Sequence, residues 1–336
     1  MTRKKTLATS LLSLSTGLML ALSAAGGATA APAKTQDSGQ PQVTSTAVSN
    51  SPTDQYWTPE RMRAAVPGDV LADKAVARQI NTGLSATSDI AERGSSTKIA
   101  GTPAMVTQQA LHTDVAPINH IGKVFFTMAG ANYVCSGNSV VSENKSTVAT
   151  AGHCVNDGPG AFAKNFVFVP GYVDGTAPLG KWPAKKLYAP SQWSKLGNIQ
   201  YDTGFAVVAQ LDGQSLADVV GASGVQFNQP RGMTYTSYGY PAAVPFTGQT
   251  LVSCTGKAGT DAINPQFKTQ GIPCDMTGGS SGGPWFIQGA TDAERDSNGY
   301  QNSINSYGYG TRSTTMFGPY WGQTIEKVYK NASSAG

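Results

Sequence analysis

The sequence predicts an all-β fold, a barrel or a sandwich, for the part of the chain that follows residue 112. Short runs rich in Val, Phe, Tyr and Thr recur there, and Gly, Pro, Asn and Asp separate them. Many short strands with turn residues between them favour a barrel or sandwich over alternating strands and helices. A region of this length can bury a substantial core, for example as two packed barrels. The expected strands are IGKVFFTM (121–128), NSVVSE (138–143), KSTVATAG (145–152), NFVFVPG (165–171), TGFAVVAQL (203–211), MTYTSYGYP (233–241) and TLVSCTG (250–256).

A helix is predicted near the C-terminus. YWGQTIEKVYKN (320–331) is the one good helical pattern late in the chain. No internal repeat is present. We therefore expect an all-β region that ends in a single helix.

Residues 1–30 have the pattern of a secretory signal peptide. MTRKK is basic, LLSLSTGLMLAL is apolar, and AGGATA ends the segment with small residues, which places a cut after Ala30. A membrane anchor is the alternative, but the apolar run is short and Ser, Thr and Gly interrupt it. We expect a secreted, extracellular protein with no membrane partner.

Residues 31–112 are expected to form a loosely ordered, propeptide-like leader; a plain disordered spacer is the alternative. Residues 31–55 are rich in Ser, Thr, Gln, Pro and Ala and should be disordered. A short helix is predicted in WTPERMRAA, with Thr58 as N-cap and Pro59 at its first position. A second helix is predicted for DVLADKAVARQI (69–80), stopped near Gly83.

The net charge of +4 has little meaning for the mature protein. Arg3, Lys4 and Lys5 lie in the signal, which has no acidic residue, so the remainder carries 4 − 3 = +1. A near-neutral surface gives no electrostatic reason to expect nucleic acid or anionic lipid as a partner.

The four cysteines, Cys135, Cys154, Cys254 and Cys274, form an even set in a chain expected to be exported, so disulfides are predicted. Three pairings are possible. Pairing neighbours would close two modest loops, each worth about 3 kcal/mol in the chain-entropy model. A zinc site is the alternative, but no C-x-x-C spacing occurs and the few histidines are not clustered, so we expect no metal.

Three fragments carry the residue types of nucleophilic catalysis. His153 lies in TVATAGHCV, Asp202 opens an apolar run in NIQYDTGFAVV, and Ser281 lies in GGSSGGP. Each also has an ordinary structural interpretation, as a buried histidine, a turn residue and a linker. Together they supply a base, a carboxylate that can fix the imidazole tautomer, and a hydroxyl between glycines. The backbone N–H groups of Gly279 and Ser281 can then converge on a developing oxyanion.

The order of these residues along the chain narrows the choice. His153 comes first, Asp202 second and Ser281 last. The α/β-hydrolase order requires a histidine after the serine, and none follows His153. The subtilisin order requires an aspartate before the histidine; Asp114 stands there, but the Gly-rich signatures of that fold are missing. One triad order remains.

The motifs TAGHC, YDTGF and GSSGGP resemble those of the chymotrypsin-like (trypsin-like) serine endopeptidases. CDMTGGSSGGPW is most similar to secreted bacterial members near the glutamyl endopeptidase branch. The resemblance covers residues 113–325 and implies two antiparallel β-barrels with a catalytic cleft between them. It implies that His153 is the general base and acid, Asp202 its orienting partner, and Ser281 the nucleophile that forms an acyl-enzyme.

The same resemblance assigns the surroundings of the triad. Gly279 and Ser281 would make the oxyanion hole, and Cys135 and Cys154 match the disulfide that braces the histidine loop. NSYGY resembles the family's Ser-aromatic-Gly strand. There Ser306 and Gly308 would pair with the substrate backbone and Tyr307 would flank the cleft.

Three positions depart from the family pattern. Ser280 stands where many members have an aspartate that receives the new N-terminal ammonium, so the leader is expected to act by assisting folding or by covering the cleft. Asp275 has the offset of a pocket aspartate that binds Arg or Lys, but Thr277 replaces a cysteine there, which leaves a buried pairing or a turn role as the alternative. Asn305 stands where glutamyl endopeptidases use a histidine, so a preference for acidic residues is not expected.

The sequence therefore predicts a secreted serine endopeptidase made as a zymogen. The expected division is a signal peptide (1–30), a propeptide-like leader (31–112) and a serine peptidase domain (113–336). The expected partners are protein or peptide substrates and the chain's own propeptide, with no cofactor, no nucleic acid and a monomeric state. A catalytically silent chymotrypsin-like binding protein is the alternative.

Overall fold

The structure is a computed structural model. It describes residues 42–48, 53–82, 97–99, 115–289, 299–310 and 313–336. The predicted signal peptide and parts of the predicted leader lie outside these residues. None of the helices within the described ranges is both long and apolar enough to cross a membrane.

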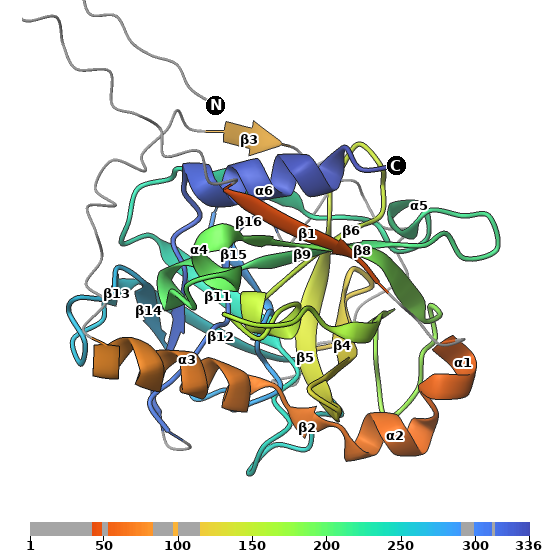
Figure 1. The fold of residues 1–336 in the computed structure, drawn as a ribbon, viewed down its shortest axis with the longest axis horizontal. Helices are drawn as coiled ribbons and strands as arrows, with labels where there is room; N and C mark the ends of the chain where they lie inside the picture. The colour runs from red at the N-terminus through yellow and green to blue at the C-terminus, as the bar shows by residue number, and fades with distance from the viewer. Residues whose placement is uncertain (1–41, 49–52, 83–96, 100–114, 290–298, 311–312) are drawn as a thin grey trace, which may run out of the picture. The chain divides into compact units, whose positions relative to one another are not determined.

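The first half of the region after residue 112 closes into a six-stranded antiparallel barrel (Figure 1). Its strands follow the sheet order β8-β7-β4-β5-β6-β9, and β9 pairs back to β8, which closes the ring. The interior is apolar, with Val124, Phe126 and Phe168 fully buried. The strands are β4 (Ile121–Met128), β5 (Ala131–Val140), β6 (Thr147–Thr150), β7 (Lys164–Pro170), β8 (Trp182–Pro190) and β9 (Gly204–Val208).

The second half consists of a larger and a smaller sheet. The larger has the order β12-β11-β15-β16-β10, and the smaller has the order β13-β14-β17. One pairing differs from the antiparallel prediction, because β10 runs parallel to β16. Parallel neighbours need a long connection, and here the chain between them forms β11 to β15. The strands are β10 (Gly224–Phe227), β11 (Thr234–Gly239), β12 (Val252–Lys257), β13 (Gly259–Thr260), β14 (Gln270–Pro273), β15 (Pro284–Ile287), β16 (Tyr300–Ile304) and β17 (Thr315–Gly318).

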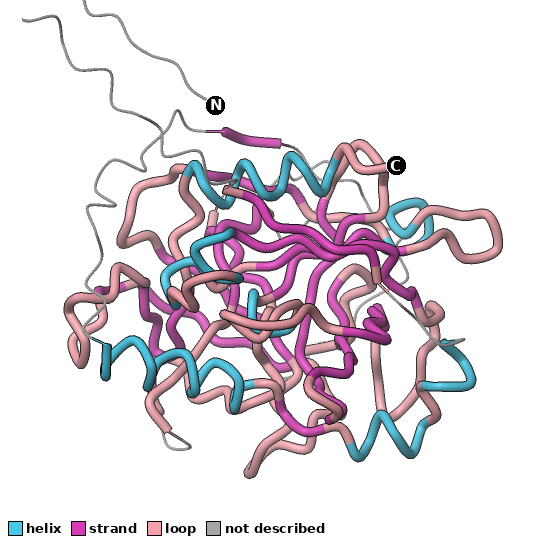
Figure 2. Tube along the Cα trace, viewed as in Figure 1, coloured by secondary structure: helices cyan, strands magenta, loops and turns pink. Residues whose placement is uncertain are grey.

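The predicted C-terminal helix is confirmed as α6 (Gln323–Ser333). Its apolar face is buried, and Tyr329 contacts both Phe205 of β9 and Phe227 of β10, with ring centroids 5.8 and 5.3 Å away. The helix therefore packs against strands of both halves. Figure 2 shows α6 and α3 outside the strands. Two further short helices are α4 (Ser191–Ser194) and α5 (Leu216–Val220), and the 3-10 turns are η2 (Gly152–Cys154) and η3 (Ile199–Tyr201).

Both helices predicted in the leader are present. In α2 (Pro59–Ala64) the Thr58 side chain accepts a hydrogen bond from the Arg61 N–H, as expected of an N-cap. α3 (Asp69–Thr82) covers the second predicted helix, and a single turn, α1 (Thr53–Tyr56), precedes both.

The prediction of disorder for residues 31–55 is wrong where the structure describes them. β1 (Val43–Ala47) pairs antiparallel with β8, so an extended Ser/Thr-rich segment fills the exposed edge of a strand. Two more leader segments are also strands: β2 (Val66–Pro67) pairs with β5, and β3 (Thr97–Ile99) pairs with β10. The leader thus adds strands to both halves.

Candidate active site

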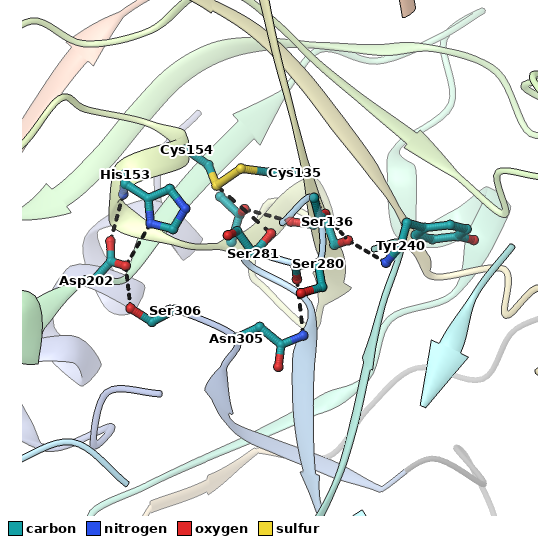
Figure 3. The surroundings of a disulfide bond; sticks show 12 residues. Cys135, Ser136, His153, Cys154, Asp202, Tyr240, Ser280, Ser281, Asn305 and Ser306 are labelled. Atoms are coloured by element: carbon teal, nitrogen blue, oxygen red, sulfur yellow. Dashed lines mark hydrogen bonds and ion pairs between the residues drawn. A yellow bond between two sulfur atoms is a disulfide. The ribbon is translucent and has the colours of Figure 1, made fainter. Parts of the chain in front are cut away.

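His153 and Asp202 form a buried pair (Figure 3). His153 lies in η2, directly after β6, and Asp202 lies between η3 and β9, so both come from loops of the first barrel. The imidazole Nδ1 is 2.8 Å from Asp202 Oδ2, and Asp202 Oδ1 accepts the His153 backbone N–H at 2.7 Å. Neither side chain is exposed to solvent. A carboxylate held in this way fixes the ring orientation and keeps the proton on Nδ1.

Ser306 contacts the same carboxylate. Its hydroxyl donates a hydrogen bond to Asp202 Oδ2 at 2.5 Å, across from the second half of the molecule. The expectation for Ser306 concerned its backbone and a substrate, and this side-chain contact adds a different role. Asp202 therefore receives three hydrogen bonds, which is a sufficient set of partners for a fully buried carboxylate.

Ser281 lies on a rigid turn between β14 and β15. Gly279 and Gly282 on either side have φ of +94° and +82°, a backbone conformation that favours glycine. A Cβ at Gly282 would lie 2.1 Å from Thr150 Oγ1, so no larger residue fits there. The Ser281 carbonyl accepts the Ser136 N–H at 2.7 Å, which joins the turn to the first barrel. The glycines permit this turn, and the close packing at Gly282 and the hydrogen bond to Ser136 hold it in place.

The turn brings Ser281 next to the histidine loop. Cys154 Sγ is 4.0 Å from the Ser281 carbonyl oxygen, and the disulfide between Cys135 and Cys154 lies beside both (Figure 3). His153 Nε2 is buried and neither donates nor accepts a hydrogen bond. In the described part of the chain the N–H groups of Gly279 and Ser281 also donate none. The base nitrogen and the two backbone donors therefore have no partner within the described residues. Catalytic hydrogen bonds are often completed only when substrate is bound.

Asn305 has a role in the site that the sequence did not predict. In the sequence it was notable only because it replaces the histidine of glutamyl endopeptidases. Its side chain is fully buried and uses all four of its hydrogen-bonding positions. Oδ1 accepts from Ser237 Oγ and Trp285 Nε1, each at 2.7 Å. Nδ2 donates to the carbonyls of Tyr238 and Ser280, at 3.0 and 3.1 Å. The amide thus ties the Ser281 turn to its neighbouring strands.

A pocket opens beside Ser281. Its lining includes Asp275, Thr277 and Gly278 from the segment before Ser281, and Ser306, Tyr307 and Gly308 from the segment after β16. The alternative of a buried Asp275 is not borne out, because this residue is exposed. The remaining described lining residues are Asp69, Asp73, Ala243, Met276, Ser280, Gly310, Ser313 and Met316.

Tyr307 lines this pocket, although its side chain is almost wholly buried. It is 2% exposed, and its hydroxyl bonds Asp261 Oδ2 at 2.9 Å and Thr269 Oγ1 at 2.7 Å. Its ring stacks on Phe317 with centroids 5.0 Å apart. Burial raises the pKa of the Tyr307 phenol well above its ordinary value, so this hydroxyl stays protonated.

Two leader carboxylates, Asp69 and Asp73, also line the pocket, which no motif predicted. Burial raises the pKa of Asp69 above its ordinary value, and the nearby His153 opposes part of that shift. Only the position of Asp69 directly after Pro67-Gly68, at a predicted helix start, marks it in the sequence.

The cysteines pair as neighbours, Cys135 with Cys154 and Cys254 with Cys274. Cys135, Cys154 and His153 lie close enough together to suggest metal ligands. The two sulfurs are bonded to each other, however, and a cysteine binds metal as a free thiolate. This cluster is therefore a disulfide beside a histidine.

Solved structures resemble this chain closely. Protease Anisep from Arthrobacter nicotinovorans is 64% identical with a TM-score of 0.63, over 66% of this chain and 99% of that one. A thermostable serine protease, AL20, from an extremophilic microorganism is 48% identical with a TM-score of 0.61, over 65% and 99%. A Glu endopeptidase structure, 22% identical with a TM-score of 0.50 over 68% and 96%, agrees with the predicted fold.

A curated relative points to the same group. A glutamyl endopeptidase of Bacillus licheniformis is 32% identical over 148 residues, and this match spans less than half of either protein, 43% of each. No protein-family model matches the chain. The two protease structures nevertheless match over nearly their whole length. The chain therefore belongs to the chymotrypsin-like serine endopeptidases, near the glutamyl endopeptidase branch.

Proposed function

We propose that this protein is a secreted serine endopeptidase that cleaves peptide bonds with His153, Asp202 and Ser281. The observation that carries the proposal is the buried His153–Asp202 pair, 2.8 Å apart, beside a serine on a glycine-braced turn. A binding protein would not need a base oriented by a carboxylate next to such a serine. The proposed site therefore has the parts of a nucleophilic hydrolase.

The proposed reaction has two halves. His153 Nε2 takes the proton of the Ser281 hydroxyl while its oxygen attacks the substrate carbonyl carbon, and the N–H groups of Gly279 and Ser281 stabilise the resulting oxyanion. The imidazolium then gives this proton to the leaving amine as the C–N bond breaks. A water molecule, deprotonated by the same nitrogen, then attacks the acyl carbon. The bond from this carbon to Ser281 Oγ breaks, the acid leaves, and the imidazolium returns the proton to Oγ. Asp202 stabilises the imidazolium in both halves.

Replacing the nucleophile tests the proposal. Ser281→Ala should lower kcat on a peptide substrate by on the order of 10⁶-fold, with the fold retained. Ser334→Ala is the matched control, because the Ser334 hydroxyl donates to the Lys330 carbonyl at the end of α6 and does not line the pocket. A fluorophosphonate should label the control and leave Ser281→Ala unlabelled. A wild-type serine that stays inert in every form of the protein would favour the catalytically silent binding protein.

The substrate class is proposed as proteins or peptides, without the glutamyl preference named for the curated relative. Among the described residues lining the pocket, the charged groups are carboxylates: Asp275 of the domain, and Asp69 and Asp73 of the leader. The described lining residues include no Lys, Arg or His that could pair with an acidic substrate side chain. Cleavage-site profiling on a mixed peptide library would identify the preferred residue.

The division of the chain is proposed as well. Residues 113–336 make up 336 − 112 = 224 residues, about the share of the chain that the solved relatives cover. We propose that residues 1–30 direct export, that residues 31–112 are a propeptide that binds the domain, and that the mature enzyme is an extracellular monomer.

A further inference from the structure

The leader crosses the proposed active site. Val66 and Pro67 pair with Tyr133 and Val134 of β5, and the Gly68 N–H donates to the Val134 carbonyl at 2.9 Å. The next residue of β5 is Cys135, which forms the disulfide beside His153, so the leader runs next to this disulfide.

Gly68 fits there because it has no side chain. A Cβ at this position would lie 2.6 Å from Cys135 Sγ and 3.9 Å from His153 Cδ2. The first distance is shorter than real Cβ atoms tolerate, so the chain could not pass this close with any other residue.

Asp69 begins α3 and places its carboxylate flat against Gly278. A Cβ on Gly278 would be 2.1 Å from Oδ1, 2.2 Å from Cγ and 2.3 Å from Oδ2 of Asp69. Gly278 precedes Gly279, whose N–H is the proposed oxyanion donor. The leader carboxylate therefore lies at the edge of the site where a substrate carbonyl would bind.

The catalytic groups are closed off in this arrangement. His153 is 0% exposed and Ser281 is 3% exposed. Asp69 Oδ1 and His153 Nε2 are both buried without a hydrogen-bond partner. A peptide could not reach the histidine and the serine while Gly68 and Asp69 remain in place.

Contacts outside the cleft hold the same segment. Before it, Trp57 is fully buried, and its Nε1 donates to the Asn165 carbonyl at 2.6 Å. After it, Gln79 is buried and its Oε1 accepts the Ile199 N–H at 2.9 Å. β1 adds a strand to β8. None of these contacts depends on the chain being continuous beyond Thr82.

Resting on the proposed function, we propose that residues 66–73 are a plug in the active site, with Asp69 as its closing group. The described leader residues 42–48 and 53–82 then act as an inhibitor that stays bound through its own contacts. A cut between the leader and the domain is not sufficient for activity, and the leader must also dissociate or be degraded.

The test measures how fast a biotinylated fluorophosphonate labels Ser281 in the intact chain without its signal. Wild type should label slowly. Asp69→Ala, and separately Gly68→Val, should each label at least about tenfold faster, because each shifts the plug toward its open state. Glu60→Ala is the matched control, since it removes an exposed leader carboxylate on α2 and should behave as wild type. Near-UV circular dichroism checks that each variant is folded.

A second measurement follows the leader after limited proteolysis beyond Thr82. We expect the cut leader to co-elute with the domain in size-exclusion chromatography, and labelling of Ser281 to stay slow. Labelling should become fast only after the leader has been removed in mild denaturant and the domain has been refolded. Equal labelling rates of intact wild type, Asp69→Ala and Gly68→Val would contradict the proposal that residues 66–73 block the active site. Full labelling directly after the cut would contradict the proposal that the cut leader stays bound. In both cases Ser281 is still labelled, so the proposed function survives. Absence of labelling in every form, including the leader-free one, would instead refute the proposed function.

Discussion

At the scale of single residues, Asn305 holds the turn that carries the proposed nucleophile. Ser280 cannot form the ion pair with a new N-terminus that orders this turn in many relatives. Its hydroxyl bonds the Thr277 carbonyl instead, and the Asn305 amide binds the Ser280 carbonyl from the other side. Neutral hydrogen bonds therefore fix this turn while the leader is still attached.

Asn305→Asp should lower kcat strongly while KM changes little. The substitution keeps the shape of the side chain but turns the amide donor into a second acceptor, which then repels the Tyr238 and Ser280 carbonyls. Leaving these buried groups unpaired costs about 1–3 kcal/mol each.

Asn302→Asp is the control for this prediction. Asn302 is equally buried, on β16, where it binds Gln226 and Tyr235 and does not touch the turn. It should lose stability but keep the kcat of the folded fraction. An equal loss of kcat in the two variants would mean that Asn305 has no special positioning role.

At the scale of elements, the two disulfides close loops of nearly equal length, with sequence separations of 19 and 20. The chain-entropy model assigns each about 3 kcal/mol of stability. Replacing either pair by alanines should therefore lower the free energy of unfolding by similar amounts in denaturant titrations.

The effects on catalysis should differ between the two pairs. Removing Cys135 and Cys154 frees the loop that carries His153, so kcat should fall. Removing Cys254 and Cys274 frees the chain before Asp275 in the pocket wall, so the larger change should be in KM. Kinetics at matched folded fraction would check this, and a KM effect from the first pair without loss of kcat would contradict it.

The sequence identified the elements with strong local patterns. β4 matches IGKVFFTM residue for residue, and α6 follows the late helical pattern. β8 was missed because WPAKKLYAP contains two prolines and two lysines, although Trp182, Leu187 and Tyr188 are buried. β1 was missed because its Ser/Thr-rich composition suggests disorder. It is ordered by the edge of β8, which a local pattern cannot reveal.

The site divides in the same way. Short sequence motifs identified His153, Asp202 and Ser281 as candidate catalytic residues. The structure brings the first two into contact. Contacts between distant segments were not predictable, among them Ser306 on Asp202 and Asp69 on Gly278. Each depends on how the two halves and the leader pack, and no residue pattern encodes that packing.

At the scale of the whole molecule, polar groups buried between the two halves couple its stability to pH. Lys123 of β4 is 3% exposed, and its Nζ donates to the carbonyl of Gly248 in the second half at 2.8 Å. The ammonium also lies 4.5 Å from the Tyr172 ring centroid and 5.4 Å from that of Phe125. Burial lowers the pKa of Lys123 from 10.5 to about 7, so these contacts only partly offset the loss of hydration.

The stability of the wild type relative to Lys123→Met should rise as the pH goes from 7 to 10.5. In that window the folded state has lost the Lys123 proton and the unfolded state still carries it, so the unfolded state binds more protons and rising pH favours folding. The difference in free energy of unfolding between the two proteins should rise by at most about 1.4 kcal/mol per pH unit. Loss of the Gly248 contact in the variant adds a constant to this difference and leaves the slope unchanged.

Lys186→Met is the control, since Lys186 also lies over an aromatic ring, Tyr188 at 5.0 Å, but is not fully buried. Urea titrations across the window would measure both variants, and parallel curves for wild type and Lys123→Met would show that Lys123 remains charged in the folded protein.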